Sequence, residues 1–126
     1  MSRKIRVLLV DDDVDYARMT QLSLEKTDKF DVTIVPDARS GLEETKKNPP
    51  EIILLDLLMP ERSGGWYYNK IKQDEELSKI PVITVSALID KPDHDGVPER
   101  DRAGMISLWK PLNPELLIEA ILNEVS

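Results

Sequence analysis

The stretch Ile5-Arg6-Val7-Leu8-Leu9-Val10-Asp11-Asp12-Asp13 joins a nearly continuous apolar run to three adjacent carboxylates. Apolar runs of this length, rich in leucine and β-branched residues, are typical of strands buried on both faces of a parallel sheet. Carboxylates behind such a strand lie side by side at the edge of a core, and their charges repel unless a cation or protonation relieves them. Because one Asp is enough to cap a following helix, the cluster indicates a further role.

Four more apolar runs alternate with helical patterns along the chain. The predicted strands cover residues 5–10, 32–36, 52–55, 82–85 and 106–109. The first predicted helix follows the acidic cluster and has one face made of Tyr16, Met19, Thr20 and Leu24. The others cover residues 38–47, 63–74 and 114–125, the third with Tyr67, Tyr68 and Ile71 as its face and the last capped by Asn113. This alternation predicts βαβ units and an open parallel sheet with helices on both faces.

Residues 88–105 should supply a helix between the fourth and fifth strands, but they depart from the pattern. The segment contains Pro92, Gly96 and Pro98 and few apolar residues, and proline interrupts helices. We therefore expect the fourth helix to be short or irregular. A loop should take its place, with at most a short helix near residues 98–103.

The composition indicates one globular domain. The chain has 126 residues, of which 40% are hydrophobic and 33% charged, and it has no cysteine. It therefore fits a single core without disulfides or thiolate metal sites. No apolar run approaches the roughly 18 residues that cross a bilayer, and no signal-peptide pattern opens the chain, which favours a cytoplasmic protein. A net charge of −7 disfavours direct binding to nucleic acid or anionic membranes.

Polar side chains follow four of the predicted strands. The acidic cluster follows the first strand, Asp56 the third, Ser86 the fourth and Lys110 the fifth. In an open parallel sheet the ligand site lies beyond the carboxyl ends of the strands, so we expect these groups to converge at one rim. Each residue taken singly is more often a turn, a helix cap or a solvated charge, and the coincidence of four strand ends is what favours a site.

The set has the chemistry of phosphoryl transfer. Asp11, Asp12 and Asp56 supply oxygen ligands that suit Mg²⁺, and a carboxylate can attack phosphorus to form an acyl phosphate. Ser86 could donate a hydrogen bond to a phosphoryl oxygen, and Lys110 could offset its charge. Such transfer depends on positioning and on positive charge around the phosphoryl oxygens.

With these residues in register, the chain resembles the receiver domain of two-component response regulators over nearly its full length. The matching motifs are Val10-Asp11-Asp12-Asp13, Asp56-Leu57-Leu58-Met59-Pro60 with Ser63-Gly64, Ile80-Pro81-Val82-Ile83, Ser86-Ala87 and Lys110-Pro111. The resemblance implies a flavodoxin-like α/β fold, a five-stranded parallel sheet in the order 2-1-3-4-5. It also implies that residues 1–126 form a single receiver domain with no output domain, whose role is signalling rather than enzymatic turnover.

The resemblance also assigns roles to single residues. Asp56 would take a phosphoryl group from a phosphohistidine on a sensor histidine kinase or a histidine phosphotransfer protein. Asp12 would bind Mg²⁺ directly and Asp11 partly through water, with the backbone carbonyl of Leu58 completing the protein ligands; Mn²⁺ would suit the same set. Ser86 and Lys110 would hold the phosphoryl oxygens. The phosphorylated domain would then bind a downstream protein or relay the phosphate, as a monomer or weak dimer.

The chain departs from the family in the region that usually reports phosphorylation. Receivers commonly carry Tyr or Phe three residues before the lysine, where this chain has Ser107. Trp109 is the aromatic residue nearby, and a packed core position is favoured for it. Small Ala87 would leave the acceptor open to a donor. We expect the signal to travel differently from the usual switch, and residues 88–105 to be mobile without phosphate; strong hydrogen-exchange protection there would contradict this.

Two positions that tune dephosphorylation in the family hold Leu58 and Leu88. Apolar side chains cannot orient an attacking water, so we predict a long-lived phosphoryl group, and a half-life of seconds would contradict it. His94, among Pro92, Asp93 and Asp95, is interpreted as a solvated loop residue rather than a metal ligand.

Three other classes fit less well. A haloacid-dehalogenase-like phosphatase needs a general-acid Asp two residues after its nucleophile, where this chain has Leu58. A flavin carrier needs a phosphate loop after the first strand, and three carboxylates there would repel a phosphate. A receiver-like interaction module that works without phosphorylation usually lacks one of the key residues, and all are present here.

Overall fold

One sheet forms the centre of the molecule, with its strands in the order β2-β1-β3-β4-β6-β5. The computed structural model describes residues 3–57, 59–86, 99–100, 106–109 and 113–125. The strands are β1 (Ile5–Val10), β2 (Phe30–Val35), β3 (Ile52–Asp56), β4 (Val82–Ser86), β5 (Glu99–Arg100) and β6 (Ile106–Trp109). The first five in the spatial order pair in parallel, which confirms the predicted order 2-1-3-4-5 with β6 in the fifth place.

The short strand β5 corrects one expectation. Glu99 and Arg100, where the sequence allowed a short helix, pair antiparallel with Ser107 and Ile106 of β6. The pairing satisfies backbone groups on the outer edge of β6 that a helix at this place would have left without partners. The other residues of the segment 88–105, which we expected to be mobile, lie outside the described part of the chain.

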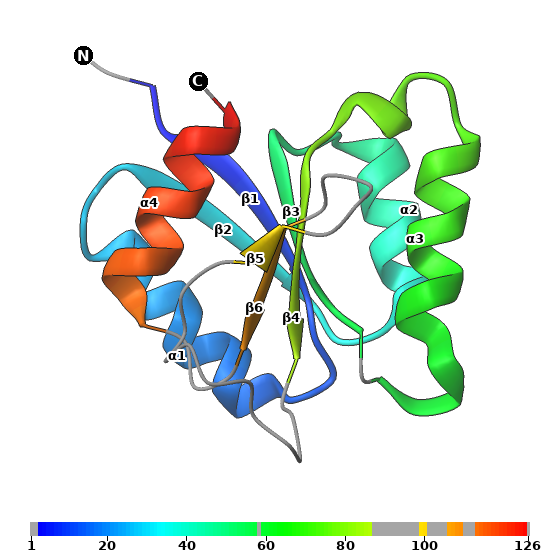
Figure 1. Ribbon diagram of the computed structural model, residues 1–126, viewed down its shortest axis with the longest axis horizontal. Coiled ribbons are helices and arrows are strands. Elements are labelled where there is room, and N and C mark those ends of the chain that lie inside the picture. Colours follow the sequence, from blue (N-terminus) through cyan, green and yellow to red (C-terminus); the bar gives the residue numbers. More distant parts are fainter. Residues whose placement is uncertain (1–2, 58, 87–98, 101–105, 110–112, 126) are drawn as a thin grey trace.

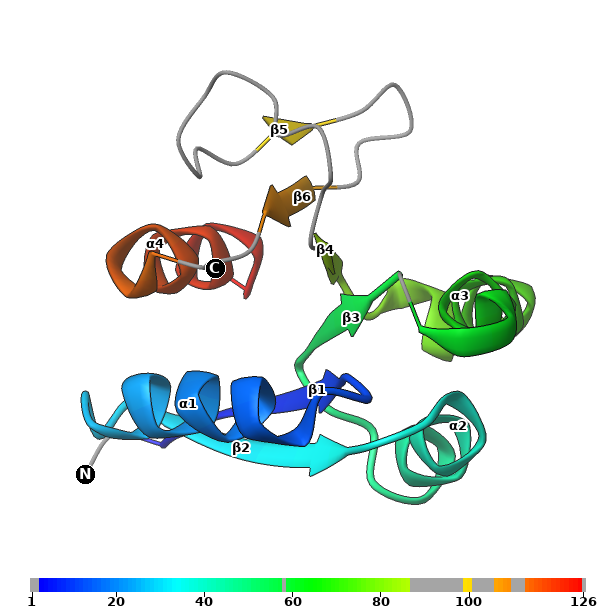
Figure 2. The ribbon, with the colours of Figure 1, turned by 90° about the horizontal axis from the view of Figure 1, so that it is seen from below.

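Four α-helices lie in the described part of the chain: α1 (Val14–Glu25), α2 (Ala38–Lys47), α3 (Ser63–Gln73) and α4 (Pro114–Val125). Short 3₁₀ turns, η1 (Pro60–Arg62) and η2 (Leu77–Lys79), flank α3. Figures 1 and 2 show α1 and α4 on one face of the sheet and α2 and α3 on the other. Within the described residues, no helix has the length and apolar character needed to cross a membrane.

The helices begin where short polar side chains can cap them. The carboxylate of Asp13 accepts a hydrogen bond from the Tyr16 N–H at 3.0 Å, and that of Asp37 accepts one from the Ser40 N–H at 2.7 Å. The Asn113 side chain accepts bonds from the N–H groups of Glu115 and Leu116. Each cap satisfies backbone donors that have no partner inside the helix.

Two apolar cores cover the two faces of the sheet. On one face, Leu9, Leu54 and Ile83 pack with residues of α1 and α4; on the other, Val10 and Leu55 pack with residues of α3. All five residues of β3 are buried. This double burial explains why the strands read as continuous apolar runs, and it places the ends of β1 and β3 deep in the rim of the sheet.

Helix α1 is rotated relative to the predicted face. The buried positions are Ala17, Thr20 and Leu24, spaced i, i+3 and i+7, whereas Met19 is 65% exposed. Met19 lies beside this stripe, so its prediction as part of the buried face was wrong. The prediction relied on the apolar side chain of Met19 rather than on its position in the helical pattern. It joins Val14 and Leu22, also exposed, on the outer surface of α1.

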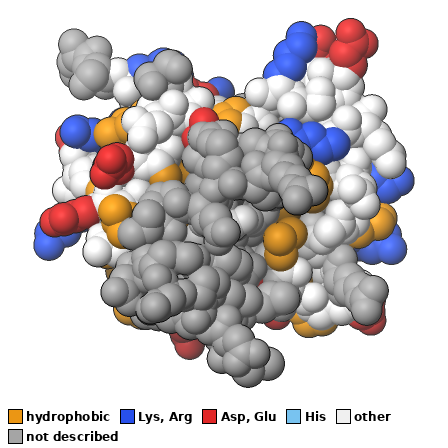
Figure 3. All heavy atoms as spheres, viewed as in Figure 1, with side chains coloured by type: hydrophobic (Ala, Val, Ile, Leu, Met, Phe, Trp, Pro, Cys, Tyr) orange, Lys and Arg blue, Asp and Glu red, His pale blue; other side chains and the backbone are white. Residues whose placement is uncertain are grey.

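Charge is divided between the two helical layers. Helices α2 and α3 carry five basic residues and two acidic ones, and α1 and α4 carry one basic residue and five acidic ones. In Figure 3, Lys and Arg side chains lie along the side of the molecule that α2 and α3 form. The net negative chain therefore has one comparatively basic side.

Candidate functional site

Three carboxylates converge at the carboxyl edge of the sheet. Asp11 and Asp12 follow β1, Asp56 ends β3, and these two strands are parallel neighbours with Val10 opposite Leu55. One carboxylate oxygen from each Asp lies within 4.8 Å of the other two. Asp11 and Asp56 are only 2% and 4% exposed, whereas Asp12 is exposed. The cluster is thus buried on one side and open to solvent on the other.

The three adjacent Asp residues have different local roles. The Asp11 N–H donates to the Val35 carbonyl at 3.1 Å, and the Asp11 carboxylate accepts the Asp13 N–H at 2.9 Å. Asp13 caps α1, so it is the one carboxylate of the three that serves the following helix. The fold therefore turns Asp13 away to the helix and leaves Asp11 and Asp12 beside Asp56.

Asp56 is held by the neighbouring strand. It lies opposite Val85 in the β3–β4 register, and the N–H of Leu57 donates to the Val85 carbonyl at 3.3 Å. This bond continues the ladder one residue past the end of β3. The main chain that carries the Asp56 carboxylate is consequently fixed on its β4 side.

The structure describes the remaining predicted site residues unequally. The main chain of Ser86 ends β4 opposite Trp109 of β6, so both belong to the same edge as the carboxylates. The side chains of Ser86 and Trp109 lie outside the described part of the chain. So do Leu58, Ala87 and Lys110, with Leu88 and His94.

Ser107 stands where receivers usually carry an aromatic residue, and it has a partner that the sequence did not indicate. Its hydroxyl lies 2.8 Å from that of Thr84 on β4, and Thr84 is 1% exposed. Polar residues opposite each other on buried strands are the signal that could have identified this pair. The two hydroxyls link β4 and β6 one step inside the rim.

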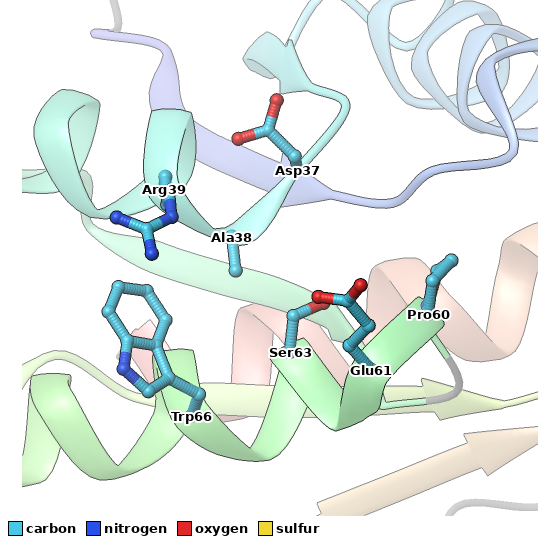
Figure 4. Close-up of a pocket in the computed structure, with 7 residues that line it drawn as sticks. All are labelled: Asp37, Ala38, Arg39, Pro60, Glu61, Ser63 and Trp66. Atoms are coloured by element: carbon cyan, nitrogen blue, oxygen red, sulfur yellow. The ribbon is translucent and has the colours of Figure 1, made fainter.

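A pocket also opens beside the site, between the first turns of α2 and α3 (Figure 4). Its volume is about 380 Å³, and it is lined by Asp37, Ala38, Arg39, Pro60, Glu61, Ser63 and Trp66. The Arg39 guanidinium lies 5.8 Å from the centre of the Trp66 ring, a cation–π distance. Hydrogen bonds from the backbone and side chain of Ser40 hold the pKa of Asp37 below its usual range. Sequence reasoning missed this pocket.

Comparison with known proteins agrees with this architecture. The family model of the response regulator receiver domain matches residues 7–122. The transcriptional regulatory protein CseB of Streptomyces avermitilis is 41% identical over 93 residues, which are 74% of this chain and 38% of CseB. The polar-differentiation response regulator DivK of Brucella ovis is 38% identical over 86 residues, covering 66% of this chain and 68% of DivK. The chain therefore spans well under half of CseB but about two thirds of DivK.

Solved structures agree as well. A sensor protein from Polaromonas sp. JS666 aligns with a TM-score of 0.81 and 25% identity, over 98% of this chain and 97% of that one. The receiver domain of Francisella response regulator 1452 aligns with a TM-score of 0.75 and 26% sequence identity, over 97% of each chain. Together with the sheet order and the carboxylate cluster, these matches show that the chain belongs to the response regulator receiver domains of two-component signalling systems.

Proposed function

We propose that this receiver domain accepts a phosphoryl group on Asp56 from a phosphohistidine donor, with Mg²⁺ held by Asp11, Asp12 and Asp56. The observation that supports this most is the convergence of these three carboxylates within 4.8 Å at the ends of two buried strands. Like charges so close destabilise a fold unless something compensates them. A divalent cation does so and is also what phosphoryl transfer requires.

The residues fit a magnesium ion. Carboxylate oxygens are the ligands that Mg²⁺ prefers, and the ion usually keeps several of its waters. Asp11 and Asp56 would approach it from the buried side, and exposed Asp12 leaves room for those waters. When bound, the ion would neutralise charge on the phosphoryl oxygens. Mn²⁺ would suit the same oxygens, and we propose the Leu58 carbonyl as a further ligand.

Asp56 is the nucleophile in this proposal. One of its carboxylate oxygens forms a bond to phosphorus as the P–N bond of the donor phosphohistidine breaks, which leaves an acyl phosphate and the free histidine of the donor. Because Asp56 is 4% exposed, the donor must approach through the rim. Small Ala87 would keep that approach open, and Ser86 and Lys110 would hold the phosphoryl oxygens.

The outer surface of α1 supports the proposal for the donor. Val14, Met19 and Leu22 are 55%, 65% and 57% exposed, and α1 starts directly behind the carboxylate cluster. Exposed apolar side chains next to a reaction site are typical of a contact surface. We propose that a sensor histidine kinase or a histidine phosphotransfer protein docks on α1, and that the phosphorylated domain then binds a downstream protein or relays the phosphate.

The test is incubation with Mg²⁺ and a small phosphodonor, followed by measurement of the intact mass. The variants are Asp56→Asn and, as a matched control, Glu43→Gln, which changes an exposed carboxylate of α2 to an amide. We expect one phosphoryl adduct on the wild type and on Glu43→Gln, none on Asp56→Asn, and none when EDTA replaces Mg²⁺. An equal adduct on Asp56→Asn would refute Asp56 as the acceptor.

A further inference from the structure

Helix α3 begins in direct contact with the main chain of the proposed phosphoacceptor. A Cβ atom built on Gly64 would lie 2.6 Å from the carbonyl oxygen of Asp56 and 2.8 Å from the Cα of Leu57. Both distances are shorter than real Cβ contacts, and both neighbours are backbone atoms, which cannot rotate aside as a side chain can. Glycine is therefore the residue that allows α3 to approach Asp56 so closely.

The main chain at Asp56 and Leu57 has little freedom to move away from Gly64. On the opposite side it is fixed to β4 by the Leu57 N–H···O=C Val85 bond and by the β3–β4 ladder. The segment thus lies between strand β4 and helix α3. Displacing it by even a fraction of an ångström would disturb the carboxylate that it carries.

Helix α3 is equally constrained from retreating. Tyr67, one turn after Gly64, is fully buried, and its hydroxyl lies 2.6 Å from that of Thr45 on α2. The Thr45 hydroxyl donates to the Gly41 carbonyl at 2.6 Å, so the Tyr67 hydroxyl is the donor to Thr45. A buried donor that loses its partner is costly. The first turn of α3 is therefore fixed to α2 as well as to Asp56.

The outer side of this same turn lines the pocket of Figure 4. Pro60, Glu61 and Ser63 lie between Asp56 and Gly64 in the chain, and Trp66 follows two residues after Gly64. Glu61 has a φ of 59°, a left-handed conformation that is unfavourable for a residue other than glycine. The residues that lead into α3 consequently line the pocket, and the same helix turn contacts the main chain of Asp56.

We propose that Gly64 is a positioning residue that couples the carboxylate site at Asp56 to the first turn of α3 and to the pocket at Trp66. Because the Asp56–Leu57 main chain lies between β4 and α3, any displacement of it when a cation is bound would be passed through the Gly64 contact to α3. This inference rests on the proposed function, because it takes Asp56 and its metal as the origin of the signal. It supplies a path that does not need an aromatic residue at position 107, where Ser107 is bonded to Thr84.

The glycines of the chain supply matched controls for the test. A Cβ at Gly65 would meet nothing within 4 Å, so Gly65→Ala changes the same helix turn without the contact. A Cβ at Gly41 would lie 3.2 Å from the Tyr67 ring and from a Val10 methyl group, so Gly41→Ala disturbs packing between α2, α3 and β1 without touching the main chain of Asp56 or Leu57. Mg²⁺ affinity is measured by calorimetry, and the indole N–H signal of Trp66 is followed by NMR, assigned with Trp66→Phe.

We expect Gly64→Ala to weaken Mg²⁺ binding by about tenfold, the lower end of the loss seen when groups that orient metal ligands are changed. We also expect Mg²⁺ to shift the Trp66 indole signal in the wild type and in Gly65→Ala, and to shift it much less in Gly64→Ala. Gly41→Ala should lose stability and keep its Mg²⁺ affinity. The coupling would be overturned if a folded Gly64→Ala variant bound Mg²⁺ with wild-type affinity. It would also be overturned if the Trp66 indole signal of the wild type did not change when Mg²⁺ binds.

If Gly64→Ala does not fold, hydrogen exchange of the wild type with and without Mg²⁺ tests the coupling instead. Coupling is reciprocal, so Mg²⁺ should raise the protection of amides in residues 66–68 of α3 more than that of residues 42–45 of α2. Equal changes in both helices would overturn the inference. If the wild type binds Mg²⁺ but forms no phosphoryl adduct, the proposed function fails while the coupling can still be tested. If the wild type binds no Mg²⁺, the proposed function and the coupling are both overturned.

Discussion

Replacing the Asp56 carboxylate by an amide should stabilise the metal-free domain and reduce its response to Mg²⁺. At the upper limit of 4.8 Å between the carboxylate oxygens, two unit charges repel by about 3.5 kcal/mol at an effective dielectric constant of about 20, and by about 0.9 kcal/mol in bulk water. Buried Asp11 contributes most of this repulsion and exposed Asp12 less. Asp56 also has an interaction of its own, which reduces the gain wherever the amide does not reproduce it. We therefore expect Asp56→Asn to raise the free energy of unfolding by about 1–3 kcal/mol in EDTA.

Mg²⁺ should offset this difference by stabilising the wild type more than the variant. A ligand that binds only the folded state at 100 times its Kd stabilises that state by about 2.7 kcal/mol. The wild type should gain this stability on addition of Mg²⁺, whereas Asp56→Asn, which lacks one of the three carboxylates, should gain little.

Urea denaturation followed by circular dichroism, in EDTA and in Mg²⁺, measures both quantities. Glu43→Gln is the control, because it removes an exposed carboxylate of α2 and should change neither. The electrostatic reasoning fails if Asp56→Asn is less stable than the wild type in EDTA, or if both proteins gain the same stability from Mg²⁺.

Three other perturbations test particular contacts. Burial raises the pKa of Tyr67 from 10.0 to about 12. The stability that the neutral phenol contributes is therefore complete below pH 10 and should be lost as the pH rises from 10 to 12, and Tyr67→Phe should remove that part of the decline in urea titrations. Asp13→Ala should cost about 1 kcal/mol through loss of the α1 cap, whereas Asp15→Ala in the same turn should cost less, and thermal unfolding compares the two. Leu22→Lys, at an exposed position of α1, should change stability by less than about 0.5 kcal/mol yet slow phosphoryl transfer from a kinase; unchanged transfer kinetics would argue against docking on α1.

Elements with a clear apolar run or helical pattern could be predicted from the sequence. The continuous apolar runs at residues 5–10 and 106–109 gave strands with the observed bounds, and helix 38–47 was likewise correct. The strand of residues 30–35 was predicted two residues late, because Phe30 and Asp31 follow a polar turn and only Val32 begins the clear apolar run. Position in a helical pattern mattered more than residue type in α1, where small Ala17 is buried and large Met19 is exposed.

The site was predictable only in part. The approach of Asp11, Asp12 and Asp56 follows from parallel strand ends, so sequence reasoning brought them together. The Gly64 contact, the Thr84–Ser107 pair and the pocket depend on how closely α2, α3 and β6 pack. Such distances are set by the folded backbone rather than by any local pattern. The pairing of Glu99–Arg100 with β6 likewise depends on an open sheet edge, which a one-dimensional pattern does not reveal.

The division of charge between the helical layers has a consequence for the rate at which partners arrive. With α2 and α3 comparatively basic and α1 and α4 acidic, the four helices contribute an electric dipole that runs across the sheet. A partner with a basic contact surface would attract the acidic α1 side of the domain. The two molecules would therefore turn toward this orientation before contact, which raises the association rate constant. At physiological ionic strength the field decays over about 8 Å, so this orientation acts only over about that distance at the end of the approach and weakens as salt is added.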